Sequence, residues 1–578
     1  MWYVGVLARD NTTTRQHDKH NKHDKHDKHL SFNPSTPTYT MEQEEITRGY
    51  AVGVQEFDWI RERNAAYVDK TKYVWQMVST DAKYFFLSRP RRFGKSLLVD
   101  TLRCYFEGRK ELFQGLFIYD KEKEWKKYPV IRIDLSNGKY FEKDMIHGTI
   151  NAILEQQERA LGITCTKDPT NYDARLTNMI EAAHQKTGER VVILIDEYDA
   201  PMLDSINKPE LQDYIRDRVR NLFSPLKSQA KLLRFVFLTG ISKFSQLSVF
   251  SELNNLQQMT FDPNYEAICG ITEEELLTQW RPDIELLTQK LNKLYSRWNL
   301  HFSFDDTVEK LKQMYDGYHF SKNFTDIYCP WSLLNAFTMG DIMNYWFSTG
   351  TPTMLINVMR RHNIKIQDIE HYQASLSRFD APTERITDPV PVLFQSGYLT
   401  LKDYNPINQK FTLGFPNGEV REGFSLSLYK YYMEDYVGSG DTLGMAFRDL
   451  LDKEITIEQF VDTLRRWYAG IPYSITDKNQ NEQLYQSLIY AALMAFGADV
   501  QAEDQTSDGR MDIALKLPDI IYIIELKYGK NAQEAIDQIV GKDYAARFAH
   551  DPRPITAIGL NISHDRRTID DTLIQPIN

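Results

Sequence analysis

The sequence predicts a multidomain α/β protein with a parallel-sheet domain containing a phosphate-binding loop, a mostly helical middle region, and a C-terminal α/β domain. Three observations predict it. Gly94-Lys95-Ser96 lies between a strand-length apolar run and a helical pattern, an apolar run ending in acids occupies 191–199, and an Asp…Glu-x-Lys pattern occupies 512–527. The length of 578 residues also exceeds what one hydrophobic core usually supports.

The first forty residues predict a disordered tail. Residues 17–29 read HDKHNKHDKHDKH, a three-residue repeat with no apolar period on which a core could form. Histidines at this spacing can hold a transition metal, but low-complexity sequence is the favoured interpretation. Met41 opens the first ordinary globular sequence, so we expect the native start there. The three folded regions are expected at 41–272, 273–470 and 471–578.

Composition and charge limit the classes of function. The chain is 42% hydrophobic and 12% aromatic, which is enough apolar material to bury real cores. No apolar run approaches the roughly 20 residues that cross a bilayer, so no membrane span is expected. The formal charge of -11 argues against coating nucleic acid through bulk electrostatics, so any such contact must be local. Four cysteines without CxxC spacing disfavour a zinc site and a disulfide framework, which favours a cytoplasmic setting.

A phosphate-binding loop is predicted between two regular elements. The run KYFFL at 83–87 fits a buried strand, and SLLVDTLRCYF at 96–106 has the apolar spacing of a helix. Loop amides and the positive helix end would hold phosphate oxygens. Lys95 would reach the β and γ phosphates, and the Ser96 hydroxyl would ligate Mg²⁺.

The loop departs from the usual motif GxxxxGK[ST]. Arg89 stands where that motif has its first glycine, which restricts the backbone at the entrance of the loop. Pro90 also removes one amide donor. Arg89, Arg91 and Arg92 are expected to compensate in part by supplying positive charge to phosphate.

Acidic residues at the end of a second strand provide the partner that such a loop needs. Residues 191–195 (VVILI) are typical of a central parallel strand, and carboxylates at its C-terminal end lie where α/β sheets bind ligands. Asp196 would hold the Mg²⁺ shell, and Glu197 would orient or deprotonate the attacking water. A third strand at 232–238 leads to Thr239, a candidate for sensing the γ phosphate.

The middle region alternates amphipathic helices with short aromatic strands and turns. YDGYHF at 315–320 is interpreted as a turn packed against a core, and 394–401 as part of a strand pair. Both are assigned mainly structural roles, with a lid, a sensor or a partner surface as the alternative. The basic stretch 216–234 could touch nucleic acid or supply an arginine finger, but solvated helix charge is the favoured explanation.

A carboxylate and lysine pattern predicts a metal site in the C-terminal region. Residues 508–515 read as a turn and a strand, and IIYIIEL at 520–526 reads as a second strand closed by Lys527. Strand side chains alternate, so Glu525 and Lys527 share one face, which is not expected to be core. Asp512 on the neighbouring strand would approach Glu525 and give two hard oxygen ligands for Mg²⁺, while Lys527 would position the attacking water.

Helical residues around this pattern extend the predicted site. Glu482 lies on an otherwise apolar helix and would add a third carboxylate, while Gln538 and Lys542 share one helix face with Tyr544 nearby. Residues 471–578 carry more acidic than basic side chains, so weak intrinsic affinity for DNA is expected. Binding of a nucleic-acid strand would then depend on the region that contains the phosphate-binding loop or on another protein.

From Tyr67 onward the chain resembles the AAA-ATPase-like family of bacterial proteins, which join an unusual P-loop domain to a C-terminal PD-(D/E)XK nuclease-like domain. The resemblance rests on YVDKTKYVWQMVS, KYFFLSRPRRFGKSLLVDTLRCYF, LIDEYDAP, FLTGISKFS, YDGYHF, PWSLLNAF and LFQSGYLTL, and covers nearly everything after Gly49. It implies that the Arg-Pro-Arg-Arg-Phe loop is the family's own form. It also carries the nuclease roles over to Asp512, Glu525 and Lys527.

These patterns predict a P-loop ATPase whose nucleotide state controls a Mg²⁺-dependent phosphodiesterase acting on DNA or RNA. The alternative is a nucleotide-dependent switch whose nuclease-like domain binds without cleaving, and a kinase ranks lowest because no acceptor site is recognisable. ATP and Mg²⁺ are the expected cofactors, nucleic acid is the expected partner, and a homo-oligomer or a protein partner is left open. The candidate catalytic residues are Glu197, Asp512, Glu525 and Lys527. The candidate nucleotide-binding residues are Arg91, Arg92, Phe93, Gly94, Lys95, Ser96, Leu97 and Thr239. The candidate metal ligands are Ser96, Asp196, Glu482, Asp512 and Glu525.

Overall fold

The computed structural model describes residues 49–577 except for 137, 139, 165–169, 206–207, 243–255, 348–371, 380–387, 433–439, 471–481, 503–504, 507–508 and 566–567. The predicted tail and the expected native start at Met41 lie outside the described residues. None of the helices in the described part of the chain combines the length and the hydropathy that a membrane crossing requires.

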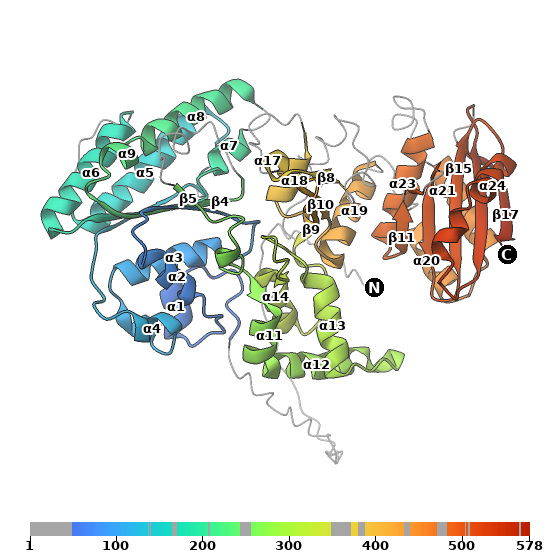
Figure 1. Ribbon diagram of the computed structural model, residues 1–578, viewed down its shortest axis with the longest axis horizontal. Helices are drawn as coiled ribbons and strands as arrows, with labels where there is room; N and C mark the ends of the chain where they lie inside the picture. The colour runs from blue at the N-terminus through green and yellow to red at the C-terminus, as the bar shows by residue number, and fades with distance from the viewer. Residues whose placement is uncertain are drawn as a thin grey trace, which may run out of the picture. The chain divides into compact units, whose positions relative to one another are not determined.

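A five-stranded sheet forms the centre of the N-terminal domain (Figure 1). All its neighbouring strands are parallel, in the order β2-β3-β4-β1-β5. The three central strands are almost wholly buried, as expected for a parallel sheet covered on both faces. This confirms the predicted parallel-sheet domain. The strands are β1 (Tyr84–Ser88), β2 (Val130–Asp134), β3 (Val191–Asp196), β4 (Leu233–Gly240) and β5 (Leu256–Gln258).

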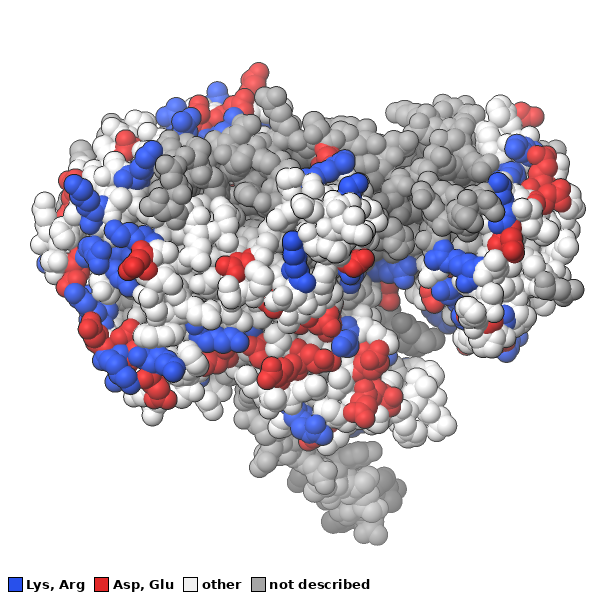
Figure 2. All heavy atoms as spheres, in the orientation of Figure 1, with Lys and Arg blue, Asp and Glu red and all other residues white. Residues whose placement is uncertain are grey.

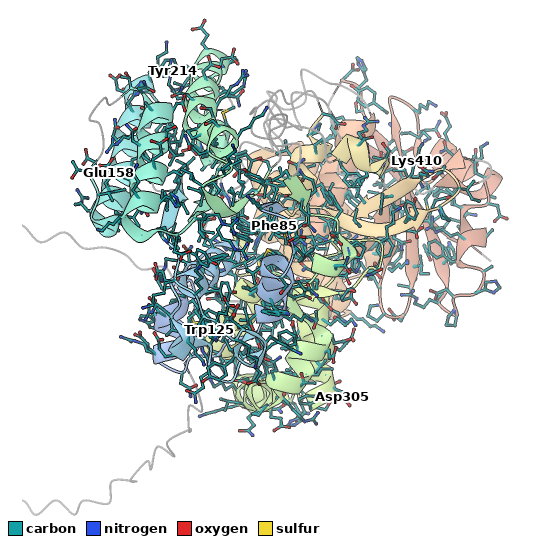
Figure 3. All side chains as sticks on the ribbon, turned by 60° about the vertical axis from the view of Figure 1, so that its left-hand side comes forward. Phe85, Trp125, Glu158, Tyr214, Asp305 and Lys410 are labelled. Atoms are coloured by element: carbon teal, nitrogen blue, oxygen red, sulfur yellow. The ribbon has the colours of Figure 1, made fainter. Side chains whose placement is uncertain are left out.

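Alternate side chains of this sheet are buried on its two faces. Phe85 packs on the face covered by α2 (Thr71–Val78) and α3 (Lys95–Phe106), whereas Phe86 packs on the face covered by α5 (Lys143–Leu161), α6 (Tyr172–Thr187) and α8 (Pro209–Phe223). In Figure 3, Phe85 lies in the packed interior, while Glu158 and Tyr214 mark α5 and α8. The shorter helices of this domain are α1 (Phe57–Glu62), η1 (Lys110–Phe113), α4 (Phe117–Lys121), α7 (Ala200–Asp204), α9 (Pro225–Ser228) and η2 (Pro263–Tyr265).

The middle region is mainly helical, as expected. Its strands form a short antiparallel pair, β6 (Ile271–Thr272) with β7 (Ile327–Tyr328), and a three-stranded sheet in the order β8-β10-β9. That sheet consists of β8 (Gln373–Ala374), β9 (Thr400–Asn405) and β10 (Lys410–Gly414). The helices are α11 (Glu273–Gln279), α12 (Arg281–Tyr295), η3 (Ser296–Trp298), α13 (Phe304–Tyr315), α14 (Pro330–Met339), α17 (Leu376–Phe379), α18 (Val390–Gln395), α19 (Gly418–Tyr432), α20 (Gly440–Leu451) and α21 (Ile457–Ala469).

The expectation of a strand pair at 394–401 is wrong in its first half. Phe394 lies in α18, which has proline in its first turn, where the missing N–H costs no hydrogen bond. Gly397 follows at φ +89°, and the Tyr398 amide donates back to the Leu393 carbonyl at 2.9 Å. This is a glycine-dependent helix ending, so the strand β9 begins only at Thr400.

The C-terminal domain is a mixed five-stranded sheet in the order β11-β14-β15-β16-β17. Only β15 and β16 are parallel within it, and α24 (Ala532–Gly541) connects them and covers one face. Ile521 and Ile523 pack on that face, so the expectation that the face of Glu525 is not core is wrong for the first half of β15. The other elements are α23 (Glu482–Ala495), β11 (Asp499–Ala502), β12 (Gln505–Thr506), β13 (Gly509–Arg510), β14 (Ile513–Lys516), β15 (Ile521–Tyr528), η5 (Tyr544–Phe548), β16 (Ile555–Ile562) and β17 (Ile569–Ile577).

Candidate functional site

The phosphate loop joins the end of β1 to the start of α3. Gly94 has φ +89°, a left-handed conformation that favours glycine, and it precedes the first residue of the helix. Lys95 is buried, and its Nζ donates to the Pro90 carbonyl at 3.2 Å and lies 3.3 Å from Glu197 Oε1. The adjacent carboxyl ends of β1, β4 and β3 therefore bring Lys95 and Glu197 together.

Asp196 presents an oxygen that no donor occupies. Its carboxylate is 1% exposed, and burial, reinforced by the charge of Glu197, raises its pKa to about 6. The nearby Ser96 hydroxyl and Lys95 oppose that rise. Oδ1 accepts a hydrogen bond from the Glu197 amide at 3.0 Å, whereas Oδ2 accepts none from the described residues. A buried, unsatisfied carboxylate oxygen beside a serine hydroxyl fits the oxygen ligand set of Mg²⁺.

Asp199 is a site residue that the sequence reasoning missed. It is fully buried, and its Oδ2 accepts from the Ile241 amide (3.0 Å), the Ser242 amide (2.6 Å) and the Ser242 hydroxyl (2.7 Å). It thereby fixes the end of β4, where the Thr239 hydroxyl is buried and has no hydrogen-bond partner among the described residues. Gly240 is required there because a Cβ would stand 2.3 Å from Asp199 Oδ1. The signal in the sequence was the third acid of the DEYD run.

Arg89 does not supply charge to phosphate, contrary to the expectation. Its guanidinium is 1% exposed and donates to the carbonyls of Ser88 (2.9 Å), Thr260 (2.8 Å) and Tyr265 (3.1 Å). It also lies 4.1 Å from the centre of the Phe320 ring. Arg89 therefore braces the start of the loop against the segment after β5, using donors that would otherwise reach a ligand.

The next three residues of the loop, Arg91 to Phe93, differ in their surroundings. Arg91 is exposed and lines the cavity described below. Arg92 has φ +71°, and its Nη1 donates to the carbonyls of Trp346 (2.7 Å) and Tyr345 (3.3 Å). The Phe93 ring is buried, with its centre 4.7 Å from that of the Tyr318 ring, and Phe93 also lines the cavity. The turn at 315–320 thus packs against the phosphate loop.

A cavity of about 540 Å³ opens at the phosphate loop. Its lining includes Arg91 to Leu97 and Glu197. Further lining residues lie within 51–74, 268–271 and 330–334, among them Lys70 and Trp331, and Ser136 and Asp204 also line the cavity. The volume lies in the usual range of small-molecule sites. The wall at 51–74 was not predicted from the sequence.

The acid and lysine residues of the C-terminal domain converge on two neighbouring strands. Pairing of Ile513 with Ile524 places Asp512 beside Glu525. The Asp512 amide donates to Glu525 Oε2 (3.3 Å), and Lys527 Nζ donates to Glu525 Oε1 (2.9 Å). Asp512 Oδ2 accepts from the Leu526 amide at 2.7 Å. The three side chains are almost completely buried, so their charges act on one another through a poorly screened environment.

Helical residues support this cluster from two sides. Gln486 on α23, which the sequence reasoning missed, is 2% exposed and donates to the Asp512 carbonyl at 3.0 Å. Gln538 on α24 donates to the Tyr544 hydroxyl at 3.0 Å. Burial raises the pKa of Tyr544, and Glu525 and Asp512 reinforce the rise, so this tyrosine lies beside the cluster. Lys542 is exposed.

The donor set for a metal consists of two carboxylates. The side chain of Glu482 lies outside the described residues, so its role as a third carboxylate stays a prediction. Within the described ranges, no group of three or more histidine, cysteine, aspartate or glutamate side chains is arranged to hold a metal ion. Two adjacent carboxylates from Asp512 and Glu525 nevertheless have the hard oxygen chemistry that Mg²⁺ takes when water completes its shell.

Comparisons with known proteins agree with this two-part organisation. A family model described as a predicted AAA-ATPase matches residues 51–250, and a model of the PD-(D/E)XK nuclease superfamily matches residues 480–572. The chain is similar to a protein of Azotobacter chroococcum mcd 1 described as an uncharacterized protein in the vnfD 5' region, with 33% identity over 540 residues. That similarity covers 91% of this chain and 98% of the relative. The chain therefore belongs to the AAA-ATPase-like family and carries a C-terminal domain of the PD-(D/E)XK nuclease superfamily.

Proposed function

We propose that this member of the AAA-ATPase-like family is a cytoplasmic bacterial ATPase whose nucleotide state controls Mg²⁺-dependent cleavage of phosphodiester bonds in DNA or RNA. The observation that carries the proposal is the convergence of Asp512, Glu525 and Lys527 in a chain that also has a nucleotide-sized cavity at its phosphate loop. Each cluster pairs carboxylates with a lysine, which is what charge stabilisation around phosphate requires.

In the ATPase half, Lys95 and Glu197 neutralise each other in this structure. A phosphate group in the loop would draw the Lys95 ammonium away, which leaves the Glu197 carboxylate able to orient a water molecule and accept its proton. Ser96 and Asp196 would hold Mg²⁺, which would offset the charge on the phosphate oxygens. Thr239, whose buried hydroxyl has no hydrogen-bond partner among the described residues, would donate that hydroxyl to the γ phosphate.

In the C-terminal half, Asp512 and Glu525 would hold Mg²⁺, which would polarise the phosphodiester and lower the pKa of a bound water. Lys527 Nζ is already oriented, because it donates to both Glu525 Oε1 and the Leu526 carbonyl at 2.9 Å. From that position the ammonium can orient the attacking water or offset the developing charge on the phosphate. Gln486 holds the backbone at Asp512.

The surface supports local contact with nucleic acid rather than coating. On the face shown in Figure 2, the basic and acidic side chains of the described residues are interspersed. The C-terminal domain also carries more acidic than basic residues. Electrostatic attraction to a polyanion is therefore weak on this face, and we propose that the ATPase half or a partner delivers the strand.

Cleavage is tested by incubating the full chain with plasmid, single-stranded DNA or RNA, with Mg²⁺ or Mn²⁺ and with or without ATP. Glu525→Gln should lower cleavage by about 100-fold or more, because it removes a charged metal ligand. Glu534→Gln is the matched control, since Glu534 is an exposed acid of the same domain. The absence of cleavage under every condition, combined with ATP-dependent assembly, would support the nucleotide-dependent switch instead.

Nucleotide binding is tested separately by titrating the full chain with a fluorescent ATP analogue. Lys95→Ala should abolish measurable binding, because its ammonium is buried and Lys95 lines the cavity. Lys72→Ala is the control, since Lys72 is an exposed lysine outside the cavity lining. Unchanged affinity of Lys95→Ala would contradict the placement of phosphate in this loop.

A further inference from the structure

The backbone at Tyr345 and Trp346 lies between opposite charges. Their carbonyls accept from Nη1 of Arg92 in the phosphate loop, at 3.3 and 2.7 Å. Their amides donate to Oε1 of Glu419, at 2.5 and 2.7 Å. The peptide group that joins Tyr345 to Trp346 is bonded at both ends, so its dipole has its negative end toward the guanidinium and its positive end toward the carboxylate. Hydrogen bonds linked through one peptide group polarise one another in a buried environment.

Within the described part of the chain, no cationic side chain forms a hydrogen bond or an ion pair with Glu419, and Arg92 lies on the other side of the backbone at Tyr345 and Trp346. It is 1% exposed, and its Oε2 accepts from the Ser332 hydroxyl at 2.6 Å. Ser332 follows Trp331, whose ring lies 4.4 Å from the Arg92 guanidinium and lines the nucleotide cavity. Burial raises the pKa of Glu419 to about 7, against the lowering effects of Ser332, the two amides and Arg92. The Arg92 charge therefore contributes to holding this carboxylate in its ionised form.

Helix α19, which begins one residue before Glu419, is fitted to the same segment. Gly423 lies against Phe347, and a Cβ on Gly423 would stand 2.2 Å from that ring. A side chain added at this contact would force the Phe347 ring or the helix to shift. The position of α19 is therefore tied to that of the segment which Arg92 holds.

The same helix contacts the C-terminal domain. Arg421 donates to the Val500 carbonyl on β11 at 2.9 Å, and the Ser425 hydroxyl lies 3.8 Å from the Met494 sulfur on α23. Helices α19 and α23 lie side by side in Figure 1 and are in direct contact. From α23, Gln486 reaches the backbone of Asp512, and β11 pairs with β14, the strand that follows Asp512.

We propose that Glu419 is a positioning residue that transmits the state of the phosphate loop to the Asp512 cluster. This rests on the proposed function. Nucleotide phosphates compete with the two carbonyls for Arg92, and this competition is the differential interaction that a ligand needs in order to shift a conformational equilibrium. Withdrawal of Arg92 leaves Glu419 buried without its opposing charge. The helix then repositions against β11 and α23, which changes the support of Asp512.

The test is hydrogen exchange of the full chain, followed by mass spectrometry of its peptides, with and without MgATP. In the wild type, ATP should slow exchange in the phosphate loop and also change exchange in 482–502. In Glu419→Ala, the first response should remain and the second should be lost. Glu419→Gln should restore part of the second response, because it keeps an acceptor for the two amides.

Glu422→Gln is the matched control on the same helix, since Glu422 accepts only an exposed hydrogen bond from Asn344 at 3.1 Å within the described residues. It should respond to ATP as the wild type does. Where the proposed cleavage is present, ATP should change its rate by about 5-fold or more in the wild type, and by no measurable factor in Glu419→Ala. Gly423→Ala keeps Glu419 but disturbs the contact of α19 with Phe347, so it should also lose the response at 482–502. This variant replaces Glu419→Ala in the test if Glu419→Ala does not fold.

Three outcomes would overturn the inference. A wild-type response confined to the phosphate loop would refute the coupling and leave the proposed ATP site standing. A folded Glu419→Ala or Gly423→Ala chain with the full wild-type response at 482–502 would refute the role of this contact. The absence of any response of the phosphate loop to ATP would refute the proposed function itself, and the coupling with it.

Discussion

Replacing Arg89 with alanine should destabilise the N-terminal domain. The change removes the Arg89 donor from three carbonyls, those of Ser88, Thr260 and Tyr265, although the Tyr265 carbonyl keeps the Ile268 amide as a donor at 3.2 Å. An orphaned buried acceptor costs about 1–3 kcal/mol, and losing the contact of the guanidinium with Phe320 adds up to about 2 kcal/mol. Removing a desolvated charge offsets part of this loss, so the expected net cost is about 3–5 kcal/mol. For a domain of this size, that corresponds to a fall in Tm on the order of 10 °C.

Thermal unfolding followed by circular dichroism measures this effect, and titration with a fluorescent nucleotide measures binding on the same samples. Arg89→Lys should lie between the wild type and alanine, because an ammonium keeps the charge but lacks the planar fork that reaches several carbonyls. Arg91→Ala is the control, since Arg91 is exposed and lines the cavity. It should weaken nucleotide binding with no change in Tm. An Arg89→Ala chain that has the Tm of the wild type but no longer binds nucleotide would refute this structural role. It would indicate instead that Arg89 binds phosphate.

Three further changes have distinct expected outcomes. Asp199→Asn should lower the kcat of ATP hydrolysis more than it raises KM, because the amide holds the end of β4 less well than the carboxylate does; an unchanged kcat in steady-state kinetics would contradict this. Burial raises the pKa of Asp316 to about 7, so the native state binds a proton that the unfolded state releases near pH 4. The free energy of unfolding should therefore fall as pH rises from about 4 to about 7, by up to about 1.4 kcal/mol per pH unit, and denaturant titrations of Asp316→Asn should show a flatter profile; parallel profiles would exclude Asp316 as the source. Gln486→Ala should reduce phosphodiester cleavage by about 10- to 100-fold while ATP affinity is retained, and equal cleavage by both chains would show that this contact is dispensable.

Local patterns were sufficient to predict the three central strands of the N-terminal sheet, but not β2 or β5. The expected runs at 83–87, 191–195 and 232–238 correspond to β1 (Tyr84–Ser88), β3 (Val191–Asp196) and β4 (Leu233–Gly240). A parallel strand covered on both faces must be apolar at nearly every position, and such a run is visible without knowledge of its neighbours. The Asp…Glu-x-Lys pattern was readable for a related reason, because alternation along a strand fixes which side chains share a face.

Two of the wrong expectations concern partners that are distant in the sequence, and the third concerns local backbone conformation. Nothing local distinguishes an arginine that binds phosphate from Arg89, whose acceptors lie at Thr260 and Tyr265. The turn at Gly397 and the helix around Phe394 depend on backbone conformation that an apolar run does not reveal. Likewise, α24 decides that Ile523 is core, although it shares the face of Glu525.

The sequence by itself determined the residue types at each candidate site, the buried strands and the two-part organisation, because these follow from short-range periodicity and from chemistry carried by adjacent residues. Only the tertiary structure decided which donors remain for a ligand. Strand order placed Glu197 beside Lys95, and the packing of α19 set Glu419 opposite Arg92 across the backbone of Tyr345 and Trp346. The physical reason is that the donors of a side chain such as Arg89 bond to the nearest buried acceptors. Folding decides which acceptors those are.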